Sequence, residues 1–233
     1  MNDFITKATF GFLMGQLFPG ALAVLGVSLL VGSVTVPQPN SLIAAVRAIT
    51  AGWSGSSTAE TFFLLGLAVG AGMLIHGIQW AVMGHLEHEF RGSSFNSYWH
   101  DRPLWFQVLI GPIKIVREIG GLFLATRHLR DASIEENVAS LHKDLIPHFN
   151  FLQEFYLYSA QFFAHTSYAL MVLLVSVFGF AIGSGFTVRR VGALGLAYVL
   201  SGLFFVLGRV QFRSLFHAEE QLVKRGEISS LGV

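Results

Sequence analysis

Three side chains near residue 88 have the types and spacing that a metal site needs. His85, His88 and Glu89 share one face of a helix, because residues three and four apart lie side by side. Imidazole nitrogens and carboxylate oxygens bind zinc and iron. Another ligand could come from His142, His148, Glu154, His217, Glu219 or Glu220. His85 and His88 form a lone pair at this spacing, which a solvated helix explains as well. We therefore predict no resident metal or cofactor and keep a His/Glu metalloenzyme as the alternative.

Six polar side chains lie within or beside long apolar stretches: Gln16, His76, Gln79, Gln161, His165 and Arg209. Polar groups in a bilayer are costly and commonly mark functional positions. His76 and Gln79 share a helix face, and so do Gln161 and His165. Together the six could satisfy Arg209 and line a gate or an oligomeric ion pore. We favour the alternative, in which Arg209 extends to the lipid headgroups and the glutamines bond neighbouring helices.

Other reaction centres have no support in the sequence. The chain has no cysteine, which excludes thiolate metal sites and cysteine nucleophiles. It also lacks a Gly-x-Ser-x-Gly elbow and a phosphate-binding Gly-Lys-Ser/Thr loop. A net charge of +1 excludes a nucleic-acid binder driven by bulk charge. We therefore predict a protein that is not an enzyme and does not bind nucleic acid.

The elements that must position these residues are membrane helices. Hydrophobic residues make up 53% of the 233 residues and charged residues only 12%, against about 25% charged in a typical soluble domain. Four stretches reach the roughly 20 apolar residues that a bilayer-spanning helix needs. They cover about 8–34, 61–83, 162–186 and 191–208. The predicted fold is all-α, an integral membrane protein with four transmembrane helices and a cytoplasmic, interfacial helical subdomain.

The chain divides into four parts on this basis. Residues 1–83 form a first transmembrane hairpin with an external loop at 35–60, and residues 162–208 form a second hairpin. Residues 84–161 form a cytoplasmic connection, and residues 209–233 a cytoplasmic tail. The two tails and this connection hold 12 of the 15 Lys and Arg residues. Because basic residues favour the cytoplasmic side, we predict cytoplasmic termini and a bacterial plasma membrane.

An amphipathic helix is predicted within the connection, at about 104–125. Its polar positions recur at spacings of three and four residues and include Gln107, Lys114 and Glu118. Arg117 adds a further charge, and the segment is too charged to span a bilayer. Trp105 fits the headgroup region, so we expect the helix to lie in the membrane interface. Pro112 should kink or divide it.

Small residues recur at helical spacing and predict close helix packing. The glycines concerned are Gly11, Gly15, Gly66, Gly70, Gly77, Gly84, Gly179 and Gly183. They could pack the helices of one chain together or form a contact between subunits. Because four helices make a thin assembly, we predict a homo-oligomer, with a four-helix bundle in each chain.

The layout resembles the small four-span membrane subunits of bacterial anti-phage defence systems, such as the Kiwa membrane component. The Phe18-Pro19-Gly20 kink and the long connection at 84–161 carry this resemblance. It implies an oligomeric membrane sensor or effector that works with a cytosolic protein. The prediction is thus a non-catalytic membrane subunit that docks a cytoplasmic partner and senses or perturbs the bilayer. A metalloenzyme and an ion channel are the alternatives.

Overall fold

The chain is helical throughout the part that the structure describes. The computed structural model describes residues 11–35, 58–85, 102–124, 143–152 and 156–230. Its elements are the π-helix η1 (Leu13–Leu17), α2 (Phe18–Thr35), α4 (Thr58–His85), α7 (Leu104–Leu124), the 3-10 helix η2 (Lys143–Leu145), α9 (Ile146–Leu152), α10 (Tyr158–Ser184) and α11 (Val188–Ser230). No strand occurs among these residues, so the predicted all-α fold is confirmed.

Four helical stretches are long and apolar enough to cross a bilayer. They are Leu13–Leu30, Thr61–Val82, Tyr158–Gly183 and Val188–Glu219. Each has at least 18 residues, or about 27 Å at a rise of 1.5 Å per residue, which approaches the roughly 30 Å of a bilayer core. The prediction of an integral membrane protein with four apolar helices is confirmed. The charges of α7 exclude it from this group.

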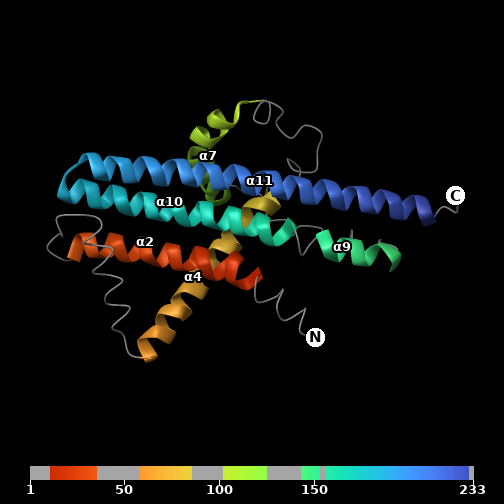
Figure 1. Ribbon diagram of the computed structural model, residues 1–233, viewed down its shortest axis with the longest axis horizontal. Helices are drawn as coiled ribbons and strands as arrows, with labels where there is room; N and C mark the ends of the chain where they lie inside the picture. The colour runs from red at the N-terminus through yellow and green to blue at the C-terminus, as the bar shows by residue number, and fades with distance from the viewer. Residues whose placement is uncertain (1–10, 36–57, 86–101, 125–142, 153–155, 231–233) are drawn as a thin grey trace.

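Three of the apolar helices lie side by side. Figure 1 shows α2, α10 and α11 along the long axis of the molecule, with α10 packed against both others. α10 and α11 form a hairpin that turns at Gly185, whose φ of 87° is rarely adopted by other residues. Arg190 stabilises the turn, because its guanidinium donates to the Gly185 carbonyl and lies 5.0 Å from the centre of the Phe180 ring. We call this the turn end, and the opposite end, at His165 and Arg209, the polar end.

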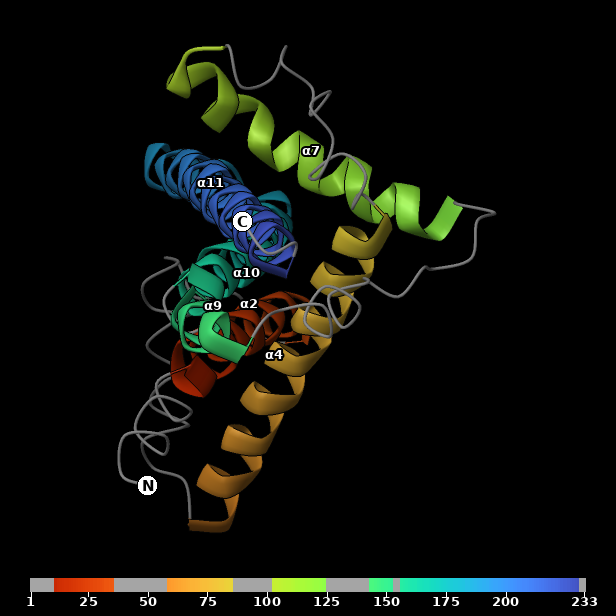
Figure 2. The same cartoon turned by 90° about the vertical axis from the view of Figure 1, so that its right-hand side faces the viewer.

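The other two long helices cross this group steeply. In Figure 2, α2, α10 and α11 are seen nearly end-on, whereas α4 and α7 are seen along their length. α4 packs mainly on α2, and α7 packs mainly on α11. The sequence predicts a bundle of four helices. The structure instead has three helices side by side, with α4 crossing them.

Glycines allow the backbones of α2 and α4 to touch at their crossing. A Cβ on Gly20 would overlap the Ala68 carbonyl, and a Cβ on Gly72 would overlap the Gln16 carbonyl. In lipid, apolar side chains gain little from associating, so close packing at small residues contributes much of the association energy. Larger residues at these two glycines would force the helices apart at the crossing.

The crossing of α7 and α11 has the same construction. A Cβ on Gly202 would overlap the Val108 carbonyl, and a Cβ on Gly111 would lie 2.9 Å from the Cα of Gly202. The Tyr198 hydroxyl adds a hydrogen bond of 2.5 Å to the Leu109 carbonyl. α7 is therefore held by backbone contact across the middle of α11.

One apolar core joins all five long helices where they cross. Its buried residues are Ala23, Ile75, Ile115, Tyr168, Ala169, Phe205 and Val206. A smaller cluster at Leu29, Val177 and Phe180 joins α2 to α10 toward the turn end. Another contains Ala160, Ala164 and Phe212, toward the polar end. The polar residues considered next lie between the central core and this last cluster.

Two helix boundaries differ from those predicted. The fourth apolar helix was expected to end near residue 208, but α11 continues without a break to Ser230. The third apolar stretch was expected to begin near residue 162, whereas α10 begins at Tyr158, after α9 ends at Leu152. Apolar length defines the part of a helix in the membrane, but a polar continuation such as 209–230 carries no signal that ends it. The proposed division of the chain into four parts remains a prediction.

Candidate functional site: a buried histidine and glutamine cluster at the helix crossings

His165 of α10 lies at the centre of the buried polar residues, with no solvent-exposed surface. Its Nδ1–H donates to the Gly15 carbonyl of η1. Its Nε2 lies 2.9 Å from the side-chain amide of Gln79 on α4. A single imidazole thus connects three helical segments that are far apart in the sequence.

The Gly15 carbonyl is available because of Pro19. In an α-helix, the carbonyl of residue 15 accepts from the N–H of residue 19, and proline has none. The chain forms the π-helix Leu13–Leu17 just before this proline, with the Phe18 N–H donating to the Leu13 carbonyl. π-Helical turns often occur at functional positions. The predicted kink at 18–20 therefore has a specific consequence, which is a backbone acceptor for a buried histidine.

The hydrogen bonds of His165 determine its protonation state. A carbonyl only accepts, so Nδ1 carries the proton, and Nε2 of a neutral ring must accept. The structure has the Gln79 oxygen Oε1 at 2.9 Å from Nε2 and leaves the amide nitrogen without a partner among the described residues. Two acceptors cannot bond each other, so we exchange the oxygen and nitrogen of this amide, which makes its NH₂ group the donor to Nε2 and places the oxygen at the other end. A doubly protonated ring would be a buried cation, which is costly unless a carboxylate pairs with it. The nearest acidic group of this cluster, Glu118, is engaged with Arg209. We therefore assign a neutral His165 with its proton on Nδ1.

His76 extends the cluster along α4. Its ring centre lies 5.2 Å from that of His165 and 6.0 Å from that of Trp80, both in edge-to-face geometry. Its Nδ1 is buried without a hydrogen-bond partner among the described residues. The same holds for the end of the Gln79 amide that does not face His165. Two buried polar atoms are thus left unsatisfied by the protein itself.

Arg209 lies near the histidine and glutamine cluster but pairs with a residue outside it. Its guanidinium forms an ion pair with Glu118 of α7 and lies 5.0 Å from the centre of the Phe205 ring. Both charged side chains are largely buried, at 11% and 14% exposed. The sequence placed Glu118 only on the polar stripe of an interfacial helix. Its pairing with Arg209 could not be found from spacing, because the two residues lie 91 positions apart.

A small cavity separates these two groups. Gln79 of α4, Tyr168 of α10 and Arg209 of α11 provide its polar lining, and the remaining lining residues are Val82, Ala164, Phe205, Gly208 and Phe212. Its volume is about 10 Å³, which is at the lower end of what one buried water molecule requires. The cavity places the histidine and glutamine cluster next to the ion pair.

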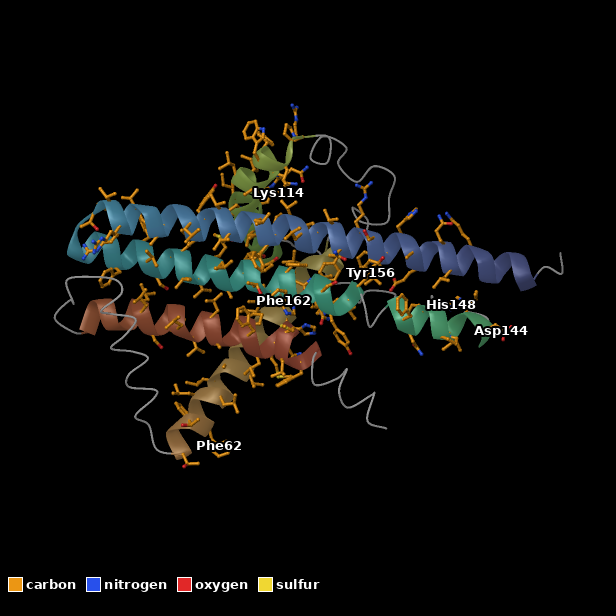
Figure 3. The ribbon with its side chains drawn as sticks, in the orientation of Figure 1. Phe62, Lys114, Asp144, His148, Tyr156 and Phe162 are labelled. Atoms are coloured by element: carbon orange, nitrogen blue, oxygen red, sulfur yellow. The ribbon has the colours of Figure 1, made fainter. Side chains whose placement is uncertain are left out.

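The two remaining predicted cluster residues lie at the edge of this site. Gln161 packs its amide against Gly15, and Gln16 is half-buried at the crossing of α2 and α4. Close by, Phe162 lies between α10 and α2 (Figure 3), with its ring centre 5.8 Å from that of Phe18. The structure thus brings His76, Gln79 and His165 into direct contact and places Arg209 across the cavity.

α7 places polar as well as apolar side chains against the rest of the protein and exposes part of its apolar surface. Gln107, Glu118 and Ile115 face inward, and the Gln107 amide donates to the Arg102 carbonyl at 2.8 Å. Other apolar residues point outward, with Trp105, Leu109, Ile113 and Val116 between 45% and 62% exposed. Arg117 is exposed and Lys114 is half-buried beside this face. An apolar outer surface suits contact with lipid rather than with water.

The metal-site hypothesis falls outside the described residues. His88 and Glu89 are not described, and nothing is known of the His85 side chain. Within the described ranges, no group of three or more His, Cys, Asp or Glu residues could hold a metal ion. The His/Glu metalloenzyme therefore stays a prediction without geometry.

The predicted packing glycines divide into two sets. Gly11, Gly15 and Gly179 lie against Tyr158, Gln161 and Leu30, respectively, within this chain. Gly66, Gly70 and Gly77 have no neighbour within 4 Å, and Gly183 is exposed. The surroundings of Gly84 lie outside the description. The first set packs helices of one chain, whereas the second leaves one face of α4 uncovered, where Phe62 also points away from the other helices (Figure 3).

Comparisons of the chain with protein-family models, with curated proteins and with solved structures find no match. The interpretation of the site therefore depends on its own geometry.

Proposed function

We propose that this protein is a non-catalytic membrane subunit that senses the state of the bilayer through α7. One observation carries the proposal. α7 presents an apolar face outward, and its inward face carries Glu118, whose ion pair with Arg209 lies beside the buried cluster. A change in the lipid around the outer face would move α7. The Glu118–Arg209 ion pair would then transmit this movement to α11 and the buried cluster.

The depth of α7 supports this role. Val188 and Arg209 are 21 residues apart, or about 32 Å along α11, which matches a hydrocarbon core of about 30 Å. Gly202, where α7 crosses, is about 10 Å from Arg209 along the helix. In-plane helices bury their apolar faces about 5–10 Å below the headgroups. The crossing therefore puts α7 near the acyl boundary of the leaflet at the polar end.

Cysteine labelling tests this placement directly, because the chain has no cysteine of its own. We would reconstitute Ile113→Cys in liposomes with a fluorescent label and measure its depth with quenchers fixed at known positions along the lipid. The matched control is Val188→Cys at the turn end, where the side chain is 91% exposed. The label at 113 should lie among the acyl chains of the polar-end leaflet. A label at 113 that is quenched only from water would overturn the proposal.

Sensing itself requires that α7 moves. Spin labels at Ile113→Cys and Val210→Cys would report the distance between α7 and α11, because both side chains are exposed. The distance should change when lysolipid is added to the bilayer. An unchanged distance over the full range of lysolipid would show that α7 is a static anchor.

The uncovered face of α4 supports a homo-oligomer as part of this proposal. Gly66, Gly70 and Gly77 recur at four and seven residues on a side of α4 that no helix of the described part of the chain approaches. Small residues at this spacing allow two helices to pack closely in lipid. A Gly70→Cys variant should cross-link between subunits in native membranes, whereas Gly195→Cys, on the open surface of α11, should not. Equal cross-linking at both sites would contradict this interface.

The same proposal includes a partner on the cytoplasmic side. α11 continues for 21 residues beyond Arg209, about 32 Å, and α9 packs along it. The resemblance of the whole chain to subunits of anti-phage defence systems supports a bacterial plasma membrane. The basic residues of its tails support a polar end that faces the cytoplasm. Affinity purification of the tagged protein from native membranes should retain a cytosolic protein, and truncation after Arg213 should release it. Phage plating on cells that express the protein, compared with the truncated form, tests the role in defence.

A further inference from the structure

We infer that one water molecule binds in the cavity between Gln79 and Arg209 and joins the histidine cluster to the Glu118–Arg209 ion pair. The water itself does not depend on the proposed function, whereas its role as a link to α7 does. The inference is based on the hydrogen bonds of Gln79, the lining of the cavity and the capacity of the guanidinium.

Gln79 provides the first argument. Its side chain is 98% buried, as only 2% of the residue is exposed, and it lines the cavity. One end of its amide serves His165, and the other end has no partner among the described residues. A buried polar atom without a hydrogen-bond partner destabilises the folded state. Because the NH₂ group must face the neutral His165, the unsatisfied end is a carbonyl oxygen that requires a donor.

The cavity provides the second argument. Its volume of about 10 Å³ is at the lower end of what one water molecule requires. A buried water needs two to four polar partners. Gln79, Tyr168 and Arg209 are the residues of its lining whose side chains can donate or accept hydrogen bonds.

Arg209 provides the third argument. A guanidinium carries five N–H donors, so it can donate to the Glu118 carboxylate and to a water at the same time. The water would then accept from Arg209 and donate to the Gln79 oxygen. The resulting chain of hydrogen bonds runs from Gly15 through His165, Gln79, the water and Arg209 to Glu118. It connects η1, α10, α4, α11 and α7, and the last four of these also share the central apolar core with α2.

A cavity-filling variant tests whether the site is wet. Val82 lines the cavity and is 2% exposed, so Val82→Ile adds one methyl group to the space. If a water is bound, the methyl displaces it and strands the Gln79 oxygen. The thermal midpoint in detergent should then fall by at least about 2–4 °C.

The decisive comparison repeats Val82→Ile in a Gln79→Leu background. Leucine removes the amide that holds the water, so the added methyl should then leave the midpoint unchanged or raise it. An equal effect of Val82→Ile in both backgrounds would overturn the inference. If Gln79→Leu does not fold, a crystal structure of the unaltered protein at high resolution decides instead. Density for a water within about 3 Å of the Gln79 amide and of Arg209 supports the inference, and a cavity without density refutes it.

The two proposals fail in different ways. Failure of the sensing role appears as an unchanged distance between labels on α7 and α11 in the lysolipid experiment. Failure of the water link appears as equal Val82→Ile effects in the two backgrounds, whether or not α7 moves.

Discussion

The two steep helix crossings of this protein are built from the same parts, but their free carbonyls have different partners. Each places a glycine beside a proline, at Pro19-Gly20 in α2 and at Gly111-Pro112 in α7. Each proline removes the N–H that would bond a carbonyl four residues earlier. At the crossing of α2 and α4, the freed Gly15 carbonyl accepts from His165. At the crossing of α7 and α11, the freed Val108 carbonyl lies against the Cα of Gly202.

This difference separates a fixed crossing from a weaker one. An imidazole N–H donor in a buried site forms a full hydrogen bond, whereas a Cα–H donor contributes about 0.5–1 kcal/mol. The attachment of α7 therefore depends mainly on the Glu118–Arg209 ion pair. The crossing of α2 and α4 is held in addition by the hydrogen bonds of His165. A helix that senses lipid should be held loosely enough to move, and α7 fits that requirement better than α4. The predictions below test this contrast between the two crossings.

The largest effect is expected from adding one methyl group where the backbones touch. Gly202→Ala and Gly72→Ala would each place a Cβ in overlap with a carbonyl of the opposing helix. Overpacking with apolar side chains typically costs about 1–3 kcal/mol. The added Cβ would overlap a backbone oxygen, which cannot move aside as a side chain can, so the cost should exceed that of breaking the Glu118–Arg209 ion pair and both variants should lose most of their folded yield. The measurement is the monodisperse fraction in detergent and its thermal midpoint.

Gly195→Ala provides the matched control on α11, because nothing lies within 4 Å of this glycine. Alanine there should stabilise the helix by about 0.5–1 kcal/mol. If Gly202→Ala were tolerated while Gly72→Ala were not, the α7 crossing would be more open than its backbone contact indicates, and the parallel between the crossings would fail.

The second effect concerns the charge that holds α7. Glu118→Gln leaves the buried Arg209 without its carboxylate, and breaking such a pair costs about 3–5 kcal/mol. The upper value is not expected, because in the proposed placement Arg209 lies near the membrane boundary and can extend toward water. Replacing both residues, as Glu118→Leu with Arg209→Met, should recover most of the loss. Chemical unfolding in mixed micelles measures both, and a double variant as unstable as Glu118→Gln would show that the pair itself adds stability.

The third effect concerns the other crossing. His165→Phe removes the donor to the Gly15 carbonyl and the acceptor for Gln79, so it should cost about 1–2 kcal/mol. Ser176→Ala is the matched control on α10, because its hydroxyl bonds only the Val172 carbonyl of its own helix, at 2.7 Å, and such local bonds add little. The same unfolding assay applies. Equal stabilities of the two variants would show that His165 does not hold this crossing together.

The membrane class and the four apolar helices follow from composition and apolar length alone. Apolar runs such as 61–83 have no other stable arrangement than a helix in lipid. These properties are local or additive, so they can be found in a single sequence. The joint cluster of His76, Gln79 and His165 was only the less favoured of two interpretations of the polar residues in the apolar stretches.

The angles of the helices and the partners across them could not be found in this way. Glycines without a neighbour, such as Gly70, have the same spacing as glycines that pack, such as Gly179. Periodicity shows that residues share a face but not which helix covers it. Pro19 was visible as a kink, yet its real effect, a carbonyl offered to His165, requires knowing that α10 lies beside it. Glu118 and Arg209 meet for the same long-range reason.

The smallest effect gives the finest test of the contrast between the crossings. Tyr198→Phe removes the hydroxyl that donates to the Leu109 carbonyl at 2.5 Å and leaves the ring in place. The bond is exposed at the edge of the crossing, and hydrogen bonds between membrane helices average about 0.6 kcal/mol, so the stability should fall by about that amount. The distribution of distances between labels on α7 and α11 should broaden clearly although the loss of stability is small, because this hydroxyl limits the rotation of α7. If Tyr198→Phe cost as much as His165→Phe, the two crossings would be equally rigid, and α7 would have no claim to be the moving helix.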